Sequence, residues 1–264
     1  MKVRVDDAPA FAFTAGTELD RQRPTVLFVH GAGQDHTLWR LEVRRLIERG
    51  WNAVAVDLPG HGDTGGTALR SIREMAGWTG SLMDRLEIDS AVIVGHSMGS
   101  LVALQLAADR PESVPGLVLT GAARSMPVHP RLLELSQEGC EEAVELVVGW
   151  VHTGPSRMGR AVQPGSWEPG VSRRTMGRSP DVLASDLVAC DAYRFTAIDS
   201  VRCPVTVVAG ALDRMTPMRS SRELAEILPD GRLVIVERTG HDVPTRAVGV
   251  LVDGVEDLRD RCLR

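Results

Sequence analysis

Gly95-His96-Ser97-Met98-Gly99 follows an apolar run at 91–94 and precedes a helical pattern at 100–109. This order predicts a sharp strand-to-helix turn with the serine at its tip, where the two glycines leave room because neither carries a Cβ. The Ser97 hydroxyl is then expected to stand exposed at the carboxyl edge of a sheet. The alternative is a glycine-rich loop that packs a helix onto a strand, with the serine there by chance.

Continuous apolar runs recur along the chain and predict strands buried on both faces. Helical patterns lie between them, an alternation that is typical of an α/β fold. We therefore expect a mostly parallel eight-stranded sheet with helices on both faces. The expected strands are 3–5, 11–14, 25–29, 53–56, 91–94, 117–119, 205–209 and 233–236, and the expected helices are 38–49, 68–87, 99–109, 219–228 and 245–260.

The alternation is interrupted once, between residues 124 and 200, where no strand-like run occurs. We predict a core domain formed by 1–123 and 201–264, with 124–200 inserted as a helical cap. Within the insertion, 130–150 has an amphipathic helical pattern, 154–180 is rich in Gly, Pro, Ser and Arg and predicts a loop, and 181–193 predicts a helix. An insertion near the carboxyl ends of the strands is well placed to cover a pocket there.

Composition narrows the classes of partner. The chain has 264 residues, of which 43% are hydrophobic, and a formal net charge of -5, which gives no footprint for nucleic acid or an anionic membrane. A small-molecule partner is expected. The four cysteines are widely spaced and no histidine cluster accompanies them, so neither a metal site, nor a cofactor, nor a disulfide framework is predicted. No signal-peptide pattern opens the sequence, and we expect a cytoplasmic protein.

A serine hydroxyl needs a base within reach and an anion behind that base. Of the seven histidines, only His241 follows the last expected strand, and Asp213 lies just past the strand at 205–209. The other usual place for the acid, directly after 117–119, reads Thr-Gly-Ala-Ala and offers no carboxylate. Asp57 also ends a strand, but its surroundings predict an Asx-type turn. The sequence therefore predicts a triad of Ser97, Asp213 and His241.

These residues, together with His30-Gly31-Ala32-Gly33 and the 57–62 turn, resemble the α/β-hydrolase superfamily over nearly the whole chain outside the insertion. The order serine, aspartate, histidine is also that of the family. The resemblance implies that the backbone N–H groups of Ala32 and Met98 form an oxyanion hole. It makes His30 a structural hydrogen-bonding residue.

Three residues are candidates for the substrate pocket. The resemblance places Trp39 near the acyl site, although core packing is an equal alternative. Gly31 lets the oxyanion loop approach the substrate. Tyr193 lies at helical spacing from Asp186 and Cys190. For all three residues, packing in the core or the cap is the favoured interpretation.

The serine nucleophile indicates the chemistry, because related dehalogenases and epoxide hydrolases carry aspartate at this position. Serine favours acyl transfer, and a carboxylic ester or lactone is the leading substrate. A carbon–carbon bond hydrolase of diketone-like ring-cleavage products and a cofactor-free haloperoxidase remain alternatives, as does a non-catalytic ligand-binding receptor on the same scaffold. An arginine-rich stretch in the insertion could attract a carboxylate-bearing substrate or be a solvated flap; its arginines are Arg157, Arg160, Arg173, Arg174 and Arg178.

Overall fold

The computed structural model describes residues 1–139, 141–152 and 168–262. Eight strands form one sheet in the order β1-β2-β4-β3-β5-β6-β7-β8. The pairs β1·β2 and β2·β4 are antiparallel and all others are parallel, which confirms the predicted sheet. The strands are β1 (Lys2–Val5), β2 (Ala8–Phe13), β3 (Thr25–Val29), β4 (Asn52–Val56), β5 (Val92–His96), β6 (Leu117–Thr120), β7 (Val205–Gly210) and β8 (Gly231–Val236).

Helices cover both faces of the sheet, and side chains of one strand alternate between them. Leu27 and Val29 of β3 face a core that includes α2, α3 and α8, whereas Val26 and Phe28 face the core under α1 and α10. Strands buried on both faces therefore read as continuous apolar runs. The helices outside 124–200 are α1 (Arg40–Glu48), α2 (Ile72–Arg85), α3 (Met98–Asp109), α8 (Met218–Ile227), α9 (Val243–Arg246), α10 (Val248–Glu256) and α11 (Arg259–Cys262).

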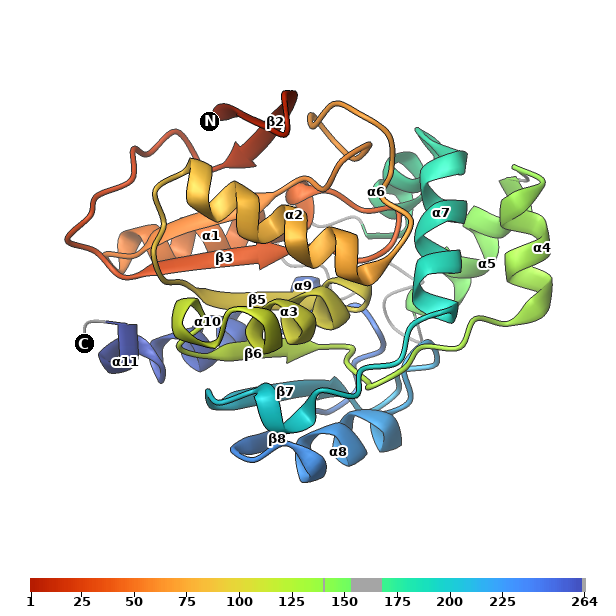
Figure 1. Cartoon of the computed structure of the whole chain (residues 1–264). Helices are drawn as coiled ribbons and strands as arrows, with labels where there is room; N and C mark the ends of the chain where they lie inside the picture. Colours follow the sequence, from red (N-terminus) through yellow and green to blue (C-terminus); the bar gives the residue numbers. More distant parts are fainter. Residues whose placement is uncertain (140, 153–167, 263–264) are drawn as a thin grey trace.

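The stretch 124–200 lies between β6 and β7 in the chain and carries the remaining α-helices: α4 (Pro130–Gln137), α5 (Glu141–Val151), α6 (Glu168–Gly177) and α7 (Pro180–Asp191). We call it the helical segment. Its helices gather beyond the carboxyl ends of the central strands (Figure 1). They pack around an apolar cluster of their own, which includes Leu132, Leu135 and Val147.

Several helix predictions need correction. The single helix expected at 130–150 is two, α4 and α5, and the chain turns between them at Gly139, whose φ is +68°. Helix α6 falls within the stretch predicted as a loop; the part of that stretch at 154–167 lies outside the described residues. The helix expected at 245–260 is divided into α9, α10 and α11. The glycine, proline and arginine content of α6 led to the prediction of a loop, but tertiary packing stabilises a helix there.

Candidate active site

Ser97 occupies the turn between β5 and α3 with φ +53° and ψ -119°, a conformation that L-residues rarely adopt. The flanking glycines are required by close backbone packing. A Cβ on Gly95 would lie 2.3 Å from the Gly99 carbonyl oxygen, and one on Gly99 would lie 2.3 Å from the Val29 carbonyl oxygen. The strand, the turn and the helix therefore meet backbone to backbone, and the predicted turn is present.

His241 and Asp213 come together because the loops that carry them touch. A Cβ on Gly210, at the end of β7, would lie 2.0 Å from the Gly240 carbonyl oxygen. His241 Nδ1 lies 2.8 Å from Asp213 Oδ2. The second carboxylate oxygen, Oδ1, accepts hydrogen bonds from the backbone N–H groups of Met215 (2.9 Å) and Thr216 (2.8 Å). With the carboxylate fixed in this way, the imidazole proton is held on Nδ1 and Nε2 is the basic nitrogen.

Gly121 explains why no carboxylate follows β6. Its φ is +56°, and a Cβ there would lie 2.6 Å from His241 Cε1, so the histidine packs directly against the bare backbone. The ring of His96 lies 4.7 Å from that of His241. Burial, reinforced by the neighbouring His241, holds the pKa of His96 well below its usual value, and His96 is therefore neutral at physiological pH.

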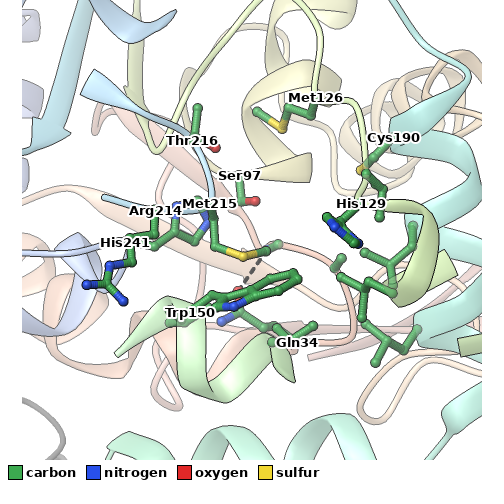
Figure 2. A pocket seen from close by; sticks show the side chains of 18 of the residues that line it. Gln34, Ser97, Met126, His129, Trp150, Cys190, Arg214, Met215, Thr216 and His241 are labelled. Atoms are coloured by element: carbon green, nitrogen blue, oxygen red, sulfur yellow. Dashed lines mark hydrogen bonds between the residues drawn. The ribbon is translucent and has the colours of Figure 1, made fainter. Parts of the chain in front are cut away.

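Ser97 and His241 line one cavity of about 330 Å³, with the Ser97 hydroxyl directed into it (Figure 2). The core contributes Gly31, Ala32 and Gln34 to the wall, and the loop after β7 contributes Met215. The opposite wall is largely apolar and comes from the helical segment: Val128, Leu132, Val147, Trp150, Val151, Met176, Leu183, Leu187 and Cys190. A pocket of this size and lining suits a small, mainly apolar molecule.

The loop after β3 is held in one orientation beside Ser97. The Gly31 carbonyl accepts hydrogen bonds from His30 Nδ1 (2.9 Å) and from the Gln34 N–H (3.2 Å), while the Gly31 N–H donates to Gln34 Oε1 (3.1 Å). In a trans peptide the N–H points opposite to the carbonyl, so the Ala32 N–H is directed away from these partners. Met98 is the first residue of α3, and its N–H has no intrahelical partner.

Asp57, the rejected candidate for the acid, is a structural residue. Its Oδ1 accepts from the His36 N–H (2.6 Å) and its Oδ2 from the Asp63 N–H (2.8 Å). Burial would raise the pKa of Asp57, but the hydrogen bonds from His36 and Asp63, together with the charges of His30 and His36, outweigh burial and lower this pKa. His30 likewise accepts from the Leu58 N–H (3.2 Å) in addition to its bond to Gly31.

The three candidate pocket residues lie in different environments. Gly31 lines the cavity, but Trp39 and Tyr193 do not. Trp39 is fully buried in the core, its ring 5.1 Å from that of Phe28. The Tyr193 hydroxyl donates to Gln105 Oε1 (2.5 Å) on α3. Sequence reasoning missed Gln34, Trp150 and Met215, which reach the cavity only through tertiary packing and carry no local signal.

The arginine-rich stretch is divided. Arg173 forms an exposed ion pair with Glu145, with Nη2 and Oε2 2.8 Å apart. Arg174 and Arg178 border a second cavity of about 500 Å³ between the helical segment and α1. Arg157 and Arg160 lie outside the described residues.

Within the described ranges, no group of three or more His, Cys, Asp or Glu side chains is placed to hold a metal ion. No helix in those ranges has the length and apolarity needed to cross a membrane.

Comparisons with known proteins show the family to which the chain is related. The sequence model of the alpha/beta hydrolase family matches residues 26–253. A putative carbamate hydrolase, RutD, from Caulobacter sp. (strain K31) is 29% identical over 244 residues, which is 86% of this chain and 86% of that protein. A pimeloyl-[acyl-carrier protein] methyl ester esterase from Aromatoleum aromaticum is 29% identical over 83% of this chain and 91% of its own length.

The fold also matches a solved structure, the enol-lactonase from Burkholderia xenovorans LB400, with a TM-score of 0.86 over 98% of this chain and 99% of that one at 21% identity. The chain belongs to the alpha/beta hydrolase family.

Proposed function

We propose that this protein is a serine hydrolase that cleaves small carboxylic esters or lactones through an acyl-enzyme on Ser97. One observation carries the proposal: a serine on a strained turn shares a cavity with a buried histidine whose Nδ1 lies 2.8 Å from an aspartate. A ligand-binding receptor has no chemical need for that pair.

The proposed reaction gives each of these groups a role. Ser97 Oγ attacks the carbonyl carbon as His241 Nε2 takes its proton, and the carbonyl oxygen becomes an oxyanion. The Ala32 and Met98 N–H groups donate hydrogen bonds to that oxygen. Collapse of the intermediate breaks the bond to the alcohol, which receives the proton from His241. A water molecule, deprotonated by His241, then attacks the acyl-enzyme and releases the acid, which restores Ser97.

The helical segment supplies the substrate-facing wall, and we assign it the role of a cap over a core formed by 1–123 and 201–264. The apolar wall and the volume of about 330 Å³ favour short acyl and alcohol groups. The two relatives are named for carbamate hydrolysis and methyl ester hydrolysis, and both reactions break a bond at a carbonyl carbon. The mechanism uses no metal or organic cofactor, and a small molecule in the cytoplasm is the partner we assign.

Labelling with a fluorophosphonate tests the proposal. The wild type should be modified on one serine, Ser97→Ala should not, and Ser113→Ala, a change in the turn after α3, should be labelled as the wild type is. An unlabelled wild type would favour the receptor alternative.

A carbon–carbon hydrolase or a haloperoxidase could use the same three residues. A panel of short aryl esters, lactones and dienoic ketoacids, with a peroxide-dependent halogenation assay beside it, separates them. The proposal expects the largest kcat/KM with an ester or lactone. Turnover of the ketoacid alone would replace ester cleavage with carbon–carbon cleavage.

A further inference from the structure

Asp186 lies in the middle of α7 and is fully buried, yet it does not line the catalytic cavity. Its Oδ2 is 2.8 Å from the Gly33 nitrogen and accepts that N–H. The same oxygen is 2.8 Å from His61 Nε2. A side chain of the helical segment thus contacts two core loops that are 153 and 125 residues away in sequence.

The surroundings of His61 favour its protonated form. Its Nδ1 faces the Pro59 carbonyl oxygen (3.1 Å) and its Nε2 faces Asp186, so both ring nitrogens meet acceptors. Burial alone would lower the pKa of His61, but the charge and hydrogen bond of Asp186, with help from Pro59 and Asp57, raise it. The remaining titratable neighbour, His30, is neutral because burial and the His61 charge lower its pKa to about 4.

Gly33 is built into the contact with α7. Its φ is +64°, which favours glycine, and a Cβ there would lie 3.0 Å from Leu183 Cδ1, on the same helix as Asp186. The ring of His61 lies 4.7 Å from that of His30, the residue that donates to the Gly31 carbonyl. The Asp186 carboxylate therefore binds the backbone at Gly33 directly. It also reaches the backbone at Gly31 indirectly, through the tilted ring contact between His61 and His30.

We propose that Asp186 is a positioning residue for the oxyanion hole, so that the hole is correctly shaped only while α7 is docked on the core. The proposal rests on the proposed function, in which the Ala32 N–H stabilises the oxyanion. That N–H belongs to the Gly31–Ala32 peptide, which His30 holds, and the next peptide plane, Ala32–Gly33, is held by Asp186. With both planes fixed, the backbone dihedrals of Ala32 are fixed as well.

Replacing Asp186 separates positioning from folding. Asp186→Leu keeps the branching of the side chain but has no acceptor. We expect kcat for a short aryl ester to fall about 10- to 100-fold with KM changed less than about threefold, since a misplacement near 1 Å can cost about 10²-fold. Asp186→Asn should restore kcat to within about threefold of the wild type. Its amide oxygen can accept from Gly33, and its amide NH₂ can donate to a neutral His61.

The matched control is Asp181→Asn, an exposed carboxylate in the first turn of the same helix, which should keep kcat within about twofold of the wild type. Rates are normalised to sites titrated with a fluorophosphonate. If Asp186→Leu lowers only the number of active sites or the melting temperature, with kcat per site unchanged, Asp186 is merely structural and the proposal is wrong. A loss confined to KM would overturn it as well.

Amide hydrogen exchange of the wild type tests the contact between Asp186 and Gly33. This measurement requires no variant and no enzymatic activity. The Gly33 amide should exchange at least about tenfold more slowly than the Ala32 amide, which faces the cavity. Equal exchange at the two positions would overturn the proposal. If Gly33 is protected but the protein is neither labelled nor active, the proposed function is wrong. The hydrogen bond from the Gly33 N–H to Asp186 would still be supported.

Discussion

The sheet and the helical segment face the same cavity, but different forces hold them in place. The strands β3 to β7 are buried on both faces, and Ser97, Asp213 and His241 follow the carboxyl ends of β5, β7 and β8. The helical segment has an apolar cluster of its own and adds Ala189, Cys190 and Phe195 to the main core. Buried polar contacts also join it to the core, and Asp186 with His61 is one of them. Under the proposed function, the residues at the sheet edge perform the chemistry and the helical segment selects the substrate, so substrate preference can change while the catalytic residues stay the same.

The largest expected effect comes from substitutions of the proposed catalytic residues in the core. His241→Ala should lower kcat about 10⁵- to 10⁶-fold and Asp213→Asn about 10⁴-fold, because one removes the base and the other allows the wrong tautomer. The melting temperature should change little by comparison. Steady-state kinetics with normalised active sites measures both. Losses below about tenfold would show that the chemistry lies elsewhere.

A matched pair of leucines tests whether the two regions unfold together. Leu27 in β3 and Leu135 in α4 are both buried. Leu27→Ala should lower the free energy of global unfolding by about 2–5 kcal/mol. Leu135→Ala should cost less globally, because the helical segment can open by itself, and should speed proteolysis within 124–200. Denaturant titration and limited proteolysis check this; equal global losses would mean one cooperative unit.

Features that leave a local pattern in the sequence could be predicted, and features that depend on distant residues could not. The strands and the Ser97 turn were predicted because burial on both faces leaves apolar runs, and because backbone contacts at Gly95 and Gly99 admit no other residue. The histidine and aspartate followed from their places after strands. Asp186 offered no comparable signal, since its partners lie more than a hundred residues away. Trp39 was misplaced because an aromatic side chain near a site in sequence can equally fill the core.

Glu42 on α1 is a buried acidic residue whose ionisation affects the stability of the fold. It is buried, and neither carboxylate oxygen has a hydrogen-bond partner among the described residues. Burial raises its pKa from 4.5 to about 8. Between these values the folded protein holds a proton that the unfolded chain releases, so wild-type stability falls as pH rises, at up to about 1.4 kcal/mol per pH unit.

Glu42→Gln removes this proton. The variant's unfolding free energy minus that of the wild type should therefore grow by about 2–4 kcal/mol from pH 5 to pH 8. Urea titrations at several pH values measure the difference. Parallel pH curves for the two proteins would show that Glu42 ionises normally.

The smallest effect concerns the outer surface of the helical segment. Arg173 is exposed and pairs with Glu145, and the cavity wall does not include it. Arg173→Ala should therefore leave the ratio of kcat/KM for neutral and anionic esters unchanged, within about twofold. A selective loss with the anionic ester, reduced by added salt, would restore a role for this arginine in substrate attraction.

The most direct test of the account is the acyl group itself. Wild-type protein mixed with a slowly hydrolysed aryl ester and quenched in acid should gain the mass of one acyl group, and peptide mapping should place it on Ser97. Gain and loss of that mass should match the burst and steady phases of product release. An acyl group on another residue, or steady turnover with no adduct at any time, would contradict the central claim that Ser97 is the nucleophile.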